Sequence, residues 1–219
     1  MASELDSEPL VFASPAQEQI FNDIRFVLPN FPEQLIYHWL LPFAEDIGWP
    51  PDLDASPMAK IARWRGILQR PLSFWRAVTW SLERLSPDQL TFTEKAMRGF
   101  RDMIEGHACD RPTLLTVFLG DSSKRRFIQQ VNNVLRTGGF TEPPAIVNVG
   151  THFEVVDGNH RIAALYFVMS DITLRAVHER NGWPSEPLSE TQEFWVAHPS
   201  VGELWAAGAN EAPGTLEDI

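Results

Sequence analysis

Cysteine is nearly absent from this chain of 219 residues, which contains only Cys109. A single cysteine cannot form an internal disulfide, and this usage suits a reducing compartment. Residues 1–8 are acidic and polar, without the basic and apolar regions of a secretory signal peptide. No apolar stretch is long enough to span a bilayer. We therefore expect a cytoplasmic protein that does not associate with a membrane.

Positive charge is also scarce. The chain has 18 Lys and Arg residues and 29 Asp and Glu residues, so its net charge is −11. Affinity for nucleic acid rests largely on cations that displace counterions from phosphates. The densest basic cluster, Lys124-Arg125-Arg126, is small. The composition therefore argues against a long nucleic acid as partner.

Several familiar catalytic motifs are missing. The chain has neither the Gly-x-x-x-x-Gly-Lys-Ser/Thr phosphate loop nor the Gly-x-Ser-x-Gly nucleophile elbow. His107, Cys109, Asp110 and His152 do not have the spacing of a recognisable metal site. These absences exclude the commonest nucleotide-hydrolysing and ester-hydrolysing motifs and leave one polar turn as the main candidate.

That turn lies in residues 153–165, FEVVDGNHRIAAL in one-letter code. Phe153 to Val156 favours a strand, Asp157-Gly158 is a break signal, and residues 162–168 predict a buried helix. The segment therefore reads as a strand, a polar turn and a helix. A helix N-terminus offers unpaired N–H groups, and the guanidinium of Arg161 matches phosphate oxygens. In the plainer alternative, Asp157 only caps the helix and the basic residues are solvated.

A predicted hairpin precedes the turn. Pro143 and Pro144 bias the chain toward extended geometry, and Ala145 to Val149 then reads as a short strand. Gly150-Thr151 forms a turn before the strand that begins at Phe153. The hairpin would deliver Asp157 to the end of a sheet, where sites in mixed folds often lie.

A second segment has a related pattern. Leu114–Leu119 reads as a strand, residues 120–127 (GDSSKRRF) as a polar turn, and Ile128–Arg136 as a helix that Gly138-Gly139 ends. Together with the hairpin and the Asp-Gly-Asn-His-Arg turn, this order resembles the core of the ParB/sulfiredoxin-like superfamily. The resemblance covers about Leu114 to Val177. It implies a small mixed sheet with helices.

The resemblance also implies phosphate chemistry on nucleotides, because members bind ATP or CTP with the equivalent turn. Some hydrolyse the nucleotide, some transfer its terminal phosphoryl group, and some are nucleases. Asp157 would orient Mg²⁺, water or an acceptor hydroxyl, and His160 would act as a donor to phosphate or a general acid. The residues expected to hold phosphates are Gly158, Asn159, His160 and Arg161 from the turn, with Ser122, Ser123 and Arg125 from the first segment.

The chain differs from known members of the superfamily in two features, and each argues against one of their functions. Sulfiredoxin needs a reactive cysteine directly before the His-Arg pair, where this chain has Asn159. Partition ParB proteins add a helix-turn-helix domain, for which residues 178–219 leave no room. We therefore expect an enzyme that hydrolyses a nucleoside triphosphate or transfers its phosphoryl group to a small-molecule or protein acceptor. Two alternatives remain. One is a metal-dependent nuclease, with Asp157 as metal ligand and His160 as general base. The other is a non-catalytic nucleotide sensor or protein-interaction module.

The region before the core reads as helical, so the chain as a whole is predicted to be α+β. Trp39, Trp64, Trp75 and Trp80 lie at helical spacing, which favours core packing over a base-stacking surface. The domains expected are a helical region at 1–110, a ParB/sulfiredoxin-like core at 111–179, and an extension at 180–219 with a mobile acidic tail. The expected helices are Pro15–Val27, Gln34–Phe43, one opening at Ser56-Pro57, Pro71–Leu85 and Phe92–Ile104.

Overall fold

A computed structural model describes residues 9–49, 58–200 and 213–214. The chain divides into two compact units, residues 1–78 and residues 79–219. Within the described ranges, no helix is both long enough and apolar enough to cross a membrane. The helix start expected at Ser56-Pro57 and most of the expected acidic tail lie outside the described residues.

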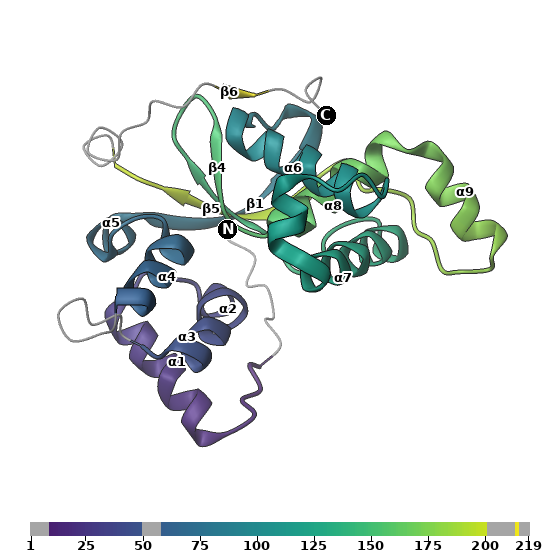
Figure 1. Cartoon of the computed structure of the whole chain (residues 1–219). Helices are drawn as coiled ribbons and strands as arrows, with labels where there is room; N and C mark the ends of the chain where they lie inside the picture. Colours follow the sequence, from purple (N-terminus) through teal and green to yellow (C-terminus); the bar gives the residue numbers. More distant parts are fainter. Residues whose placement is uncertain (1–8, 50–57, 201–212, 215–219) are drawn as a thin grey trace. The chain divides into compact units, whose positions relative to one another are not determined.

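The first unit is built from helices (Figure 1). Ser14 caps the first helix by accepting a hydrogen bond from the Gln17 amide. Trp39, Trp64 and Trp75 are buried, and Phe31 contacts both Trp39 and Trp75. This burial confirms the core reading for those three tryptophans. The elements are α1 (Pro15–Val27), α2 (Glu33–Leu35), η1 (Ile36–Leu40), α3 (Leu41–Ile47), α4 (Met58–Leu68) and α5 (Leu72–Ala77).

The second unit contains a mixed sheet with the strand order β1-β5-β3-β4-β2-β6. β1 pairs antiparallel with β5, β5 parallel with β3, and β3 antiparallel with β4. β2 pairs parallel with β4 and antiparallel with β6. The strands are β1 (Thr79–Leu85), β2 (Phe92–Thr93), β3 (Ala145–Asn148), β4 (Phe153–Asp157), β5 (Gln192–His198) and β6 (Pro213–Gly214).

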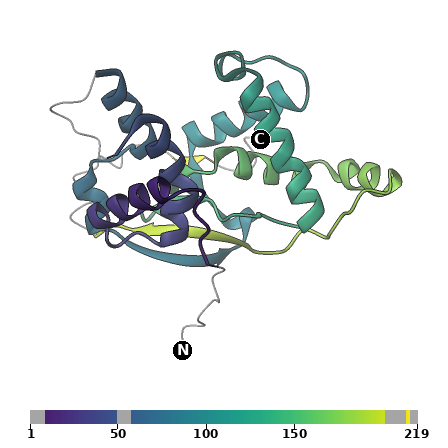
Figure 2. The ribbon, with the colours of Figure 1, turned by 90° about the horizontal axis from the view of Figure 1, so that it is seen from below.

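Helices pack on one face of this sheet, where Ile146, Val155, Phe194 and Val196 join the core (Figures 1 and 2). α8 is buried on most sides, as its nearly all-apolar sequence predicts. α7 contains a kink at Gly120, whose φ of 67° and ψ of −169° are not helical. The elements are η2 (Pro87–Gln89), α6 (Glu94–His107), α7 (Leu114–Thr137), α8 (Asn159–Ser170) and α9 (Ile172–Arg180).

Two predicted elements are wrong. The helix expected over Pro71–Leu85 stops at Ala77, and Thr79–Leu85 is a strand held by long-range pairing with β5. The all-helical region through Asp110 is therefore not confirmed. The strand expected over Leu114–Leu119 is the first part of α7, because Thr113 and Thr116 form a capping box there. An apolar run alone does not distinguish a strand from a helix.

Other predictions hold. The chain is α+β, and the hairpin is present as β3 and β4, although β3 ends at Asn148 and β4 continues to Asp157. α7 ends at Gly138, which adopts the left-handed conformation typical of a helix C-terminus. α8 begins directly after Asp157-Gly158. The strand-turn-helix order around the polar turn is thus confirmed, whereas the ParB/sulfiredoxin-like fold stays a prediction.

Candidate functional site

The polar turn forms the junction between β4 and α8. Gly158 precedes α8 with a φ of 94°, in the left-handed region that glycine adopts readily. A Cβ at this position would lie 2.7 Å from Cβ of Pro144, so glycine also fits the available space. No side chain caps the N-terminus of α8. Its first amide groups and the positive end of the helix dipole can therefore receive an anion.

The Arg161 side chain is held by hydrogen bonds and an ion pair within the fold. Its Nη1 donates to the carbonyl oxygens of Glu142 at 2.9 Å and Pro143 at 3.3 Å, while Nη2 pairs with Asp157. Its side chain is only 12% exposed. The guanidinium therefore ties the segment before β3 to the turn and holds the turn in shape. Both terminal nitrogens of Arg161 thus have acceptors within the fold, and its role as a phosphate ligand stays a prediction.

Asp157 lies at the end of β4 beside this arginine. Burial raises the pKa of its carboxyl group, while Arg161 and the Gly158 amide act in the opposite direction. Across the described ranges, no group of three or more His, Cys, Asp or Glu side chains is arranged to hold a metal ion. One carboxylate already paired with an arginine does not fit a resident Mg²⁺ site, which needs several oxygen ligands.

His160 lies at the end of a buried chain of polar side chains. Its Nε2 is 2.7 Å from Oγ of Ser123, and that hydroxyl is 3.0 Å from Nε2 of His107. Ser123 is fully buried and His107 is 5% exposed. A single hydroxyl can donate to one imidazole and accept from the other, so the chain His107–Ser123–His160 satisfies the hydroxyl and one nitrogen of each ring.

The two imidazoles in this chain resist protonation. Burial, Arg126, His107 and Arg161 together lower the pKa of His160 to about 4. Burial and Lys124 lower the pKa of His107. Both rings are therefore neutral at pH 7, and each offers one donor and one acceptor nitrogen. His160 can position a ligand or take up a proton, but it does not add a permanent positive charge.

Only one of the three site residues expected from the first segment contacts the turn. Ser123 reaches the turn through His160, as described above. Ser122 and Arg125 are exposed on α7, and within the described part of the chain neither forms a hydrogen bond to the turn. Asn159 is exposed at the first position of α8. The structure thus places Gly158, Asn159, His160 and Ser123 together, at the same turn as the Asp157–Arg161 pair.

Two residues that influence the site were not predicted as site residues from the sequence. His107 is the last residue of α6 and reaches Ser123 only because α6 packs against α7. Arg126 is exposed and influences His160 electrostatically, whereas the sequence favoured its neighbour Arg125. On a helix, consecutive side chains point about 100° apart, so only tertiary packing reveals which of two adjacent arginines approaches the turn.

Fold and site together define an α+β protein with a polar strand-turn-helix junction backed by a buried His–Ser–His chain. Comparison with protein-family models, curated proteins and solved structures gives no match in any of the three. The ParB/sulfiredoxin-like resemblance therefore rests on the residues of the turn and their order along the chain.

Proposed function

We propose that this protein binds the phosphate groups of a nucleotide at the N-terminus of α8 and hydrolyses the nucleotide or transfers its terminal phosphoryl group. The observation that carries the proposal is the uncapped start of α8 at Gly158, next to an imidazole fixed by Ser123. A helix N-terminus with a glycine at the cap lets phosphate oxygens approach backbone amides closely.

The residues of the site divide into ligands and supports. Backbone amides at the start of α8 and the side chain of Asn159 would contact phosphate oxygens. Arg126 would supply the positive charge that Arg161 cannot, because Arg126 is exposed whereas Arg161 is held by Asp157 and two carbonyl groups. Phosphoryl transfer depends mainly on such positioning and charge.

His160 would supply the proton-transfer group. Its neutral ring can accept a proton from water or from an acceptor hydroxyl, which suits a general base better than a general acid. A pKa of about 4 makes the resting imidazole a weak base. Bound phosphate would raise that pKa toward neutrality, because a nearby negative charge favours the protonated ring. Base strength would therefore depend on the presence of the nucleotide.

The test is isothermal calorimetry with ATP, CTP, GTP and UTP, each with Mg²⁺, on wild type and Asn159→Asp. An aspartate at this exposed position repels phosphate, yet it stabilises α8 by about 0.3–1 kcal/mol through the helix dipole. Nucleotide binding should weaken at least about tenfold, equivalent to about 1.4 kcal/mol, while the fold becomes no less stable. The same substitution at exposed Asn132 on α7 is the matched control and should leave binding unchanged.

A non-catalytic nucleotide sensor is the second candidate. It is favoured by the Asp157–Arg161 pair, because this pairing engages the one carboxylate of the turn that could act on a substrate. Phosphate-release assays separate the two candidates: saturable binding without turnover supports the sensor. Binding of no nucleotide by wild type would reject both. A plasmid-nicking assay tests the nuclease alternative. That alternative requires wild type to cut the plasmid and Asp157→Asn to lose this activity.

A further inference from the structure

A second polar cluster lies at the other end of the sheet. β5 ends at His198, whose side chain shares a face with Phe194 and Val196 because alternate residues of a strand point the same way. The pairing of β1 with β5 places Ser81 opposite Val196 and Glu83 opposite Phe194. Phe194 and Val196 are buried in the core, whereas Ser81, Glu83 and His198 are partly exposed. The core-facing side of the sheet thus ends in a polar patch, remote from the turn at Asp157.

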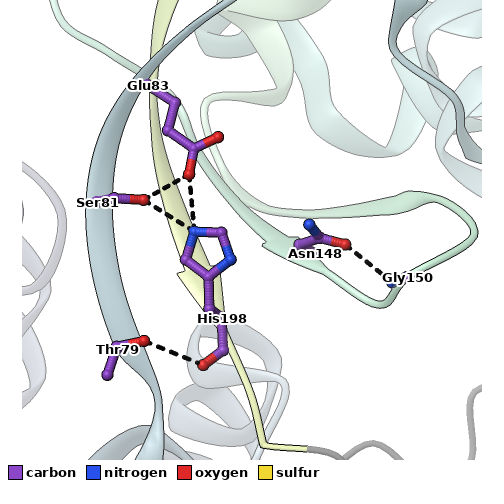
Figure 3. Close-up of polar contacts among 6 residues, drawn as sticks. All are labelled: Thr79, Ser81, Glu83, Asn148, Gly150 and His198. Carbon is purple, nitrogen blue, oxygen red and sulfur yellow. Dashed lines mark hydrogen bonds and ion pairs between the residues drawn. The ribbon is translucent and has the colours of Figure 1, made fainter.

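Three donor atoms converge in this patch (Figure 3). Nε2 of His198 is 2.8 Å from Oγ of Ser81 and 2.8 Å from Oε1 of Glu83. The Ser81 hydroxyl donates to the same Oε1 at 2.6 Å. Each atom therefore contacts the other two, and the three form a nearly equilateral triangle.

The arrangement is not that of a hydrolytic triad. In such a triad the imidazole uses one nitrogen for the serine and the other for the carboxylate. Here a single nitrogen contacts both partners, and the serine hydroxyl donates to Glu83. The second ring nitrogen points away from Ser81 and Glu83 (Figure 3). Ser81 is consequently not activated as a nucleophile by His198.

The triangle instead has the dimensions of a metal-binding face. In octahedral coordination, two donors bound to one metal ion at about 2.0–2.1 Å and at right angles lie about 2.9 Å apart. The three observed separations of 2.6 to 2.8 Å are close to that value. We propose that His198, Glu83 and Ser81 form one face of a site for a first-row divalent transition metal ion, with water molecules completing the coordination.

The chemistry of the donors selects the class of metal. An imidazole nitrogen favours Zn²⁺, Co²⁺ or Ni²⁺ over Mg²⁺ and Ca²⁺, which prefer oxygen ligands throughout. The carboxylate supplies negative charge, and the hydroxyl is a weaker neutral ligand. The side chains of His198 and Glu83 are 37% and 34% exposed, so a hydrated ion can reach them.

Proton balance is straightforward. Because Ser81 donates to Glu83, Nε2 of His198 carries the ring proton in this arrangement; metal binding at Nε2 moves that proton to Nδ1 of the same neutral ring, so none is released. The Ser81 hydroxyl keeps its proton and turns it away from the metal. The side chain of Asn148 accepts a hydrogen bond from the Gly150 amide at 2.8 Å (Figure 3).

The test uses full-length untagged protein, freed of metal by a chelator and titrated with Co²⁺ and then with Zn²⁺. Visible absorption reports Co²⁺ coordination, and calorimetry gives affinity and stoichiometry. We expect one ion per chain, displaced by Zn²⁺. The affinity should fall at least about tenfold in His198→Gln and in Glu83→Gln, and by less in Ser81→Ala, because the neutral hydroxyl is the weakest ligand.

Matched controls identify the site. His38 is an exposed histidine of the first unit, and Glu193 is a β5 glutamate that pairs with Arg84. His38→Gln and Glu193→Gln should leave Co²⁺ affinity unchanged. Circular dichroism confirms that each variant is folded. If wild type binds Co²⁺ no more tightly than His198→Gln does, the proposal is overturned, and the cluster serves only to hold β1 against β5.

Discussion

The depressed pKa of His160 makes the stability of the second unit depend on pH. In the folded chain, burial, Arg126, His107 and Arg161 lower this pKa from 6.5 to about 4. In the unfolded chain the ring returns to its ordinary value. Between pH 6.5 and pH 4 the unfolded state therefore binds more protons than the folded state, so acidification across this window destabilises the fold. Well above pH 6.5, where the ring is neutral in both states, the contribution is constant.

The magnitude follows from the size of the shift. At 1.36 kcal/mol per pKa unit, a fall from 6.5 to about 4 corresponds to about 3 kcal/mol of unfolding free energy lost on acidification. The lowered pKa of His107 acts in the same direction. The raised pKa of Asp157 acts in the opposite direction, because the folded state retains that proton at higher pH than the unfolded state. Wild type alone therefore reports the sum of these effects.

The variant His160→Gln isolates the imidazole. Glutamine does not titrate and can keep a hydrogen bond to Ser123. Urea titrations at several pH values from 4 to 7, read from the NMR intensities of α8 amides, give the unfolding free energy of the unit that contains the site. The unfolding free energy of wild type minus that of the variant should fall by about 3 kcal/mol as pH falls from 6.5 to 4. A difference that does not change with pH would refute the assignment of a depressed pKa to His160.

Three further predictions rest on paired variants. Ser123→Ala removes the partner of two buried imidazole nitrogens and should cost about 2–4 kcal/mol of unfolding free energy in urea titrations, whereas Ser122→Ala at the exposed neighbouring position should stay within about 0.5 kcal/mol. Gly158→Ala should cost about 2–4 kcal/mol of unfolding free energy by the same measurement, because φ is 94° and the new Cβ would meet Pro144. Gly150→Ala is its control: φ is 91° but the space is open, so only the backbone strain of about 1–2 kcal/mol applies. Equal costs for the two variants would contradict this explanation. Arg126→Gln should raise the pKa of His160 in an NMR titration because it removes a repelling charge, whereas Arg125→Gln should leave it unchanged; an equal rise in both would show that the two arginines act on His160 alike.

Local patterns identified the elements around the turn because their signals are short-range. The strand-forming residues from Phe153 to Val156, the break at Asp157-Gly158 and the apolar run after Arg161 each act within a few residues, and β4 and α8 follow them. The same logic gave the end of α7 at Gly138. It failed at Thr79–Leu85, where pairing with a strand more than a hundred residues away overrides local helical periodicity.

Side-chain roles were harder to predict than elements. Arg161 has the composition of a phosphate ligand, but three nearby acceptors engage it, and no local signal announces them. Leu114–Leu119 reads equally well as a strand or a helix until the capping box at Thr113 is taken into account. Residue type therefore indicated the chemistry that was available, while packing determined which groups were already in use.

The sequence by itself determined that the chain is an α+β protein with a strand-turn-helix junction at Asp157-Gly158-Asn159-His160-Arg161. Hydrophobic periodicity and glycine conformation are properties of neighbouring residues, so they are readable without a fold. Only the tertiary structure decided that His107 and Ser123 support His160 and that Ser81, Glu83 and His198 meet across two strands. Contacts between residues so distant in the chain depend on helix packing and strand register, which no local pattern specifies.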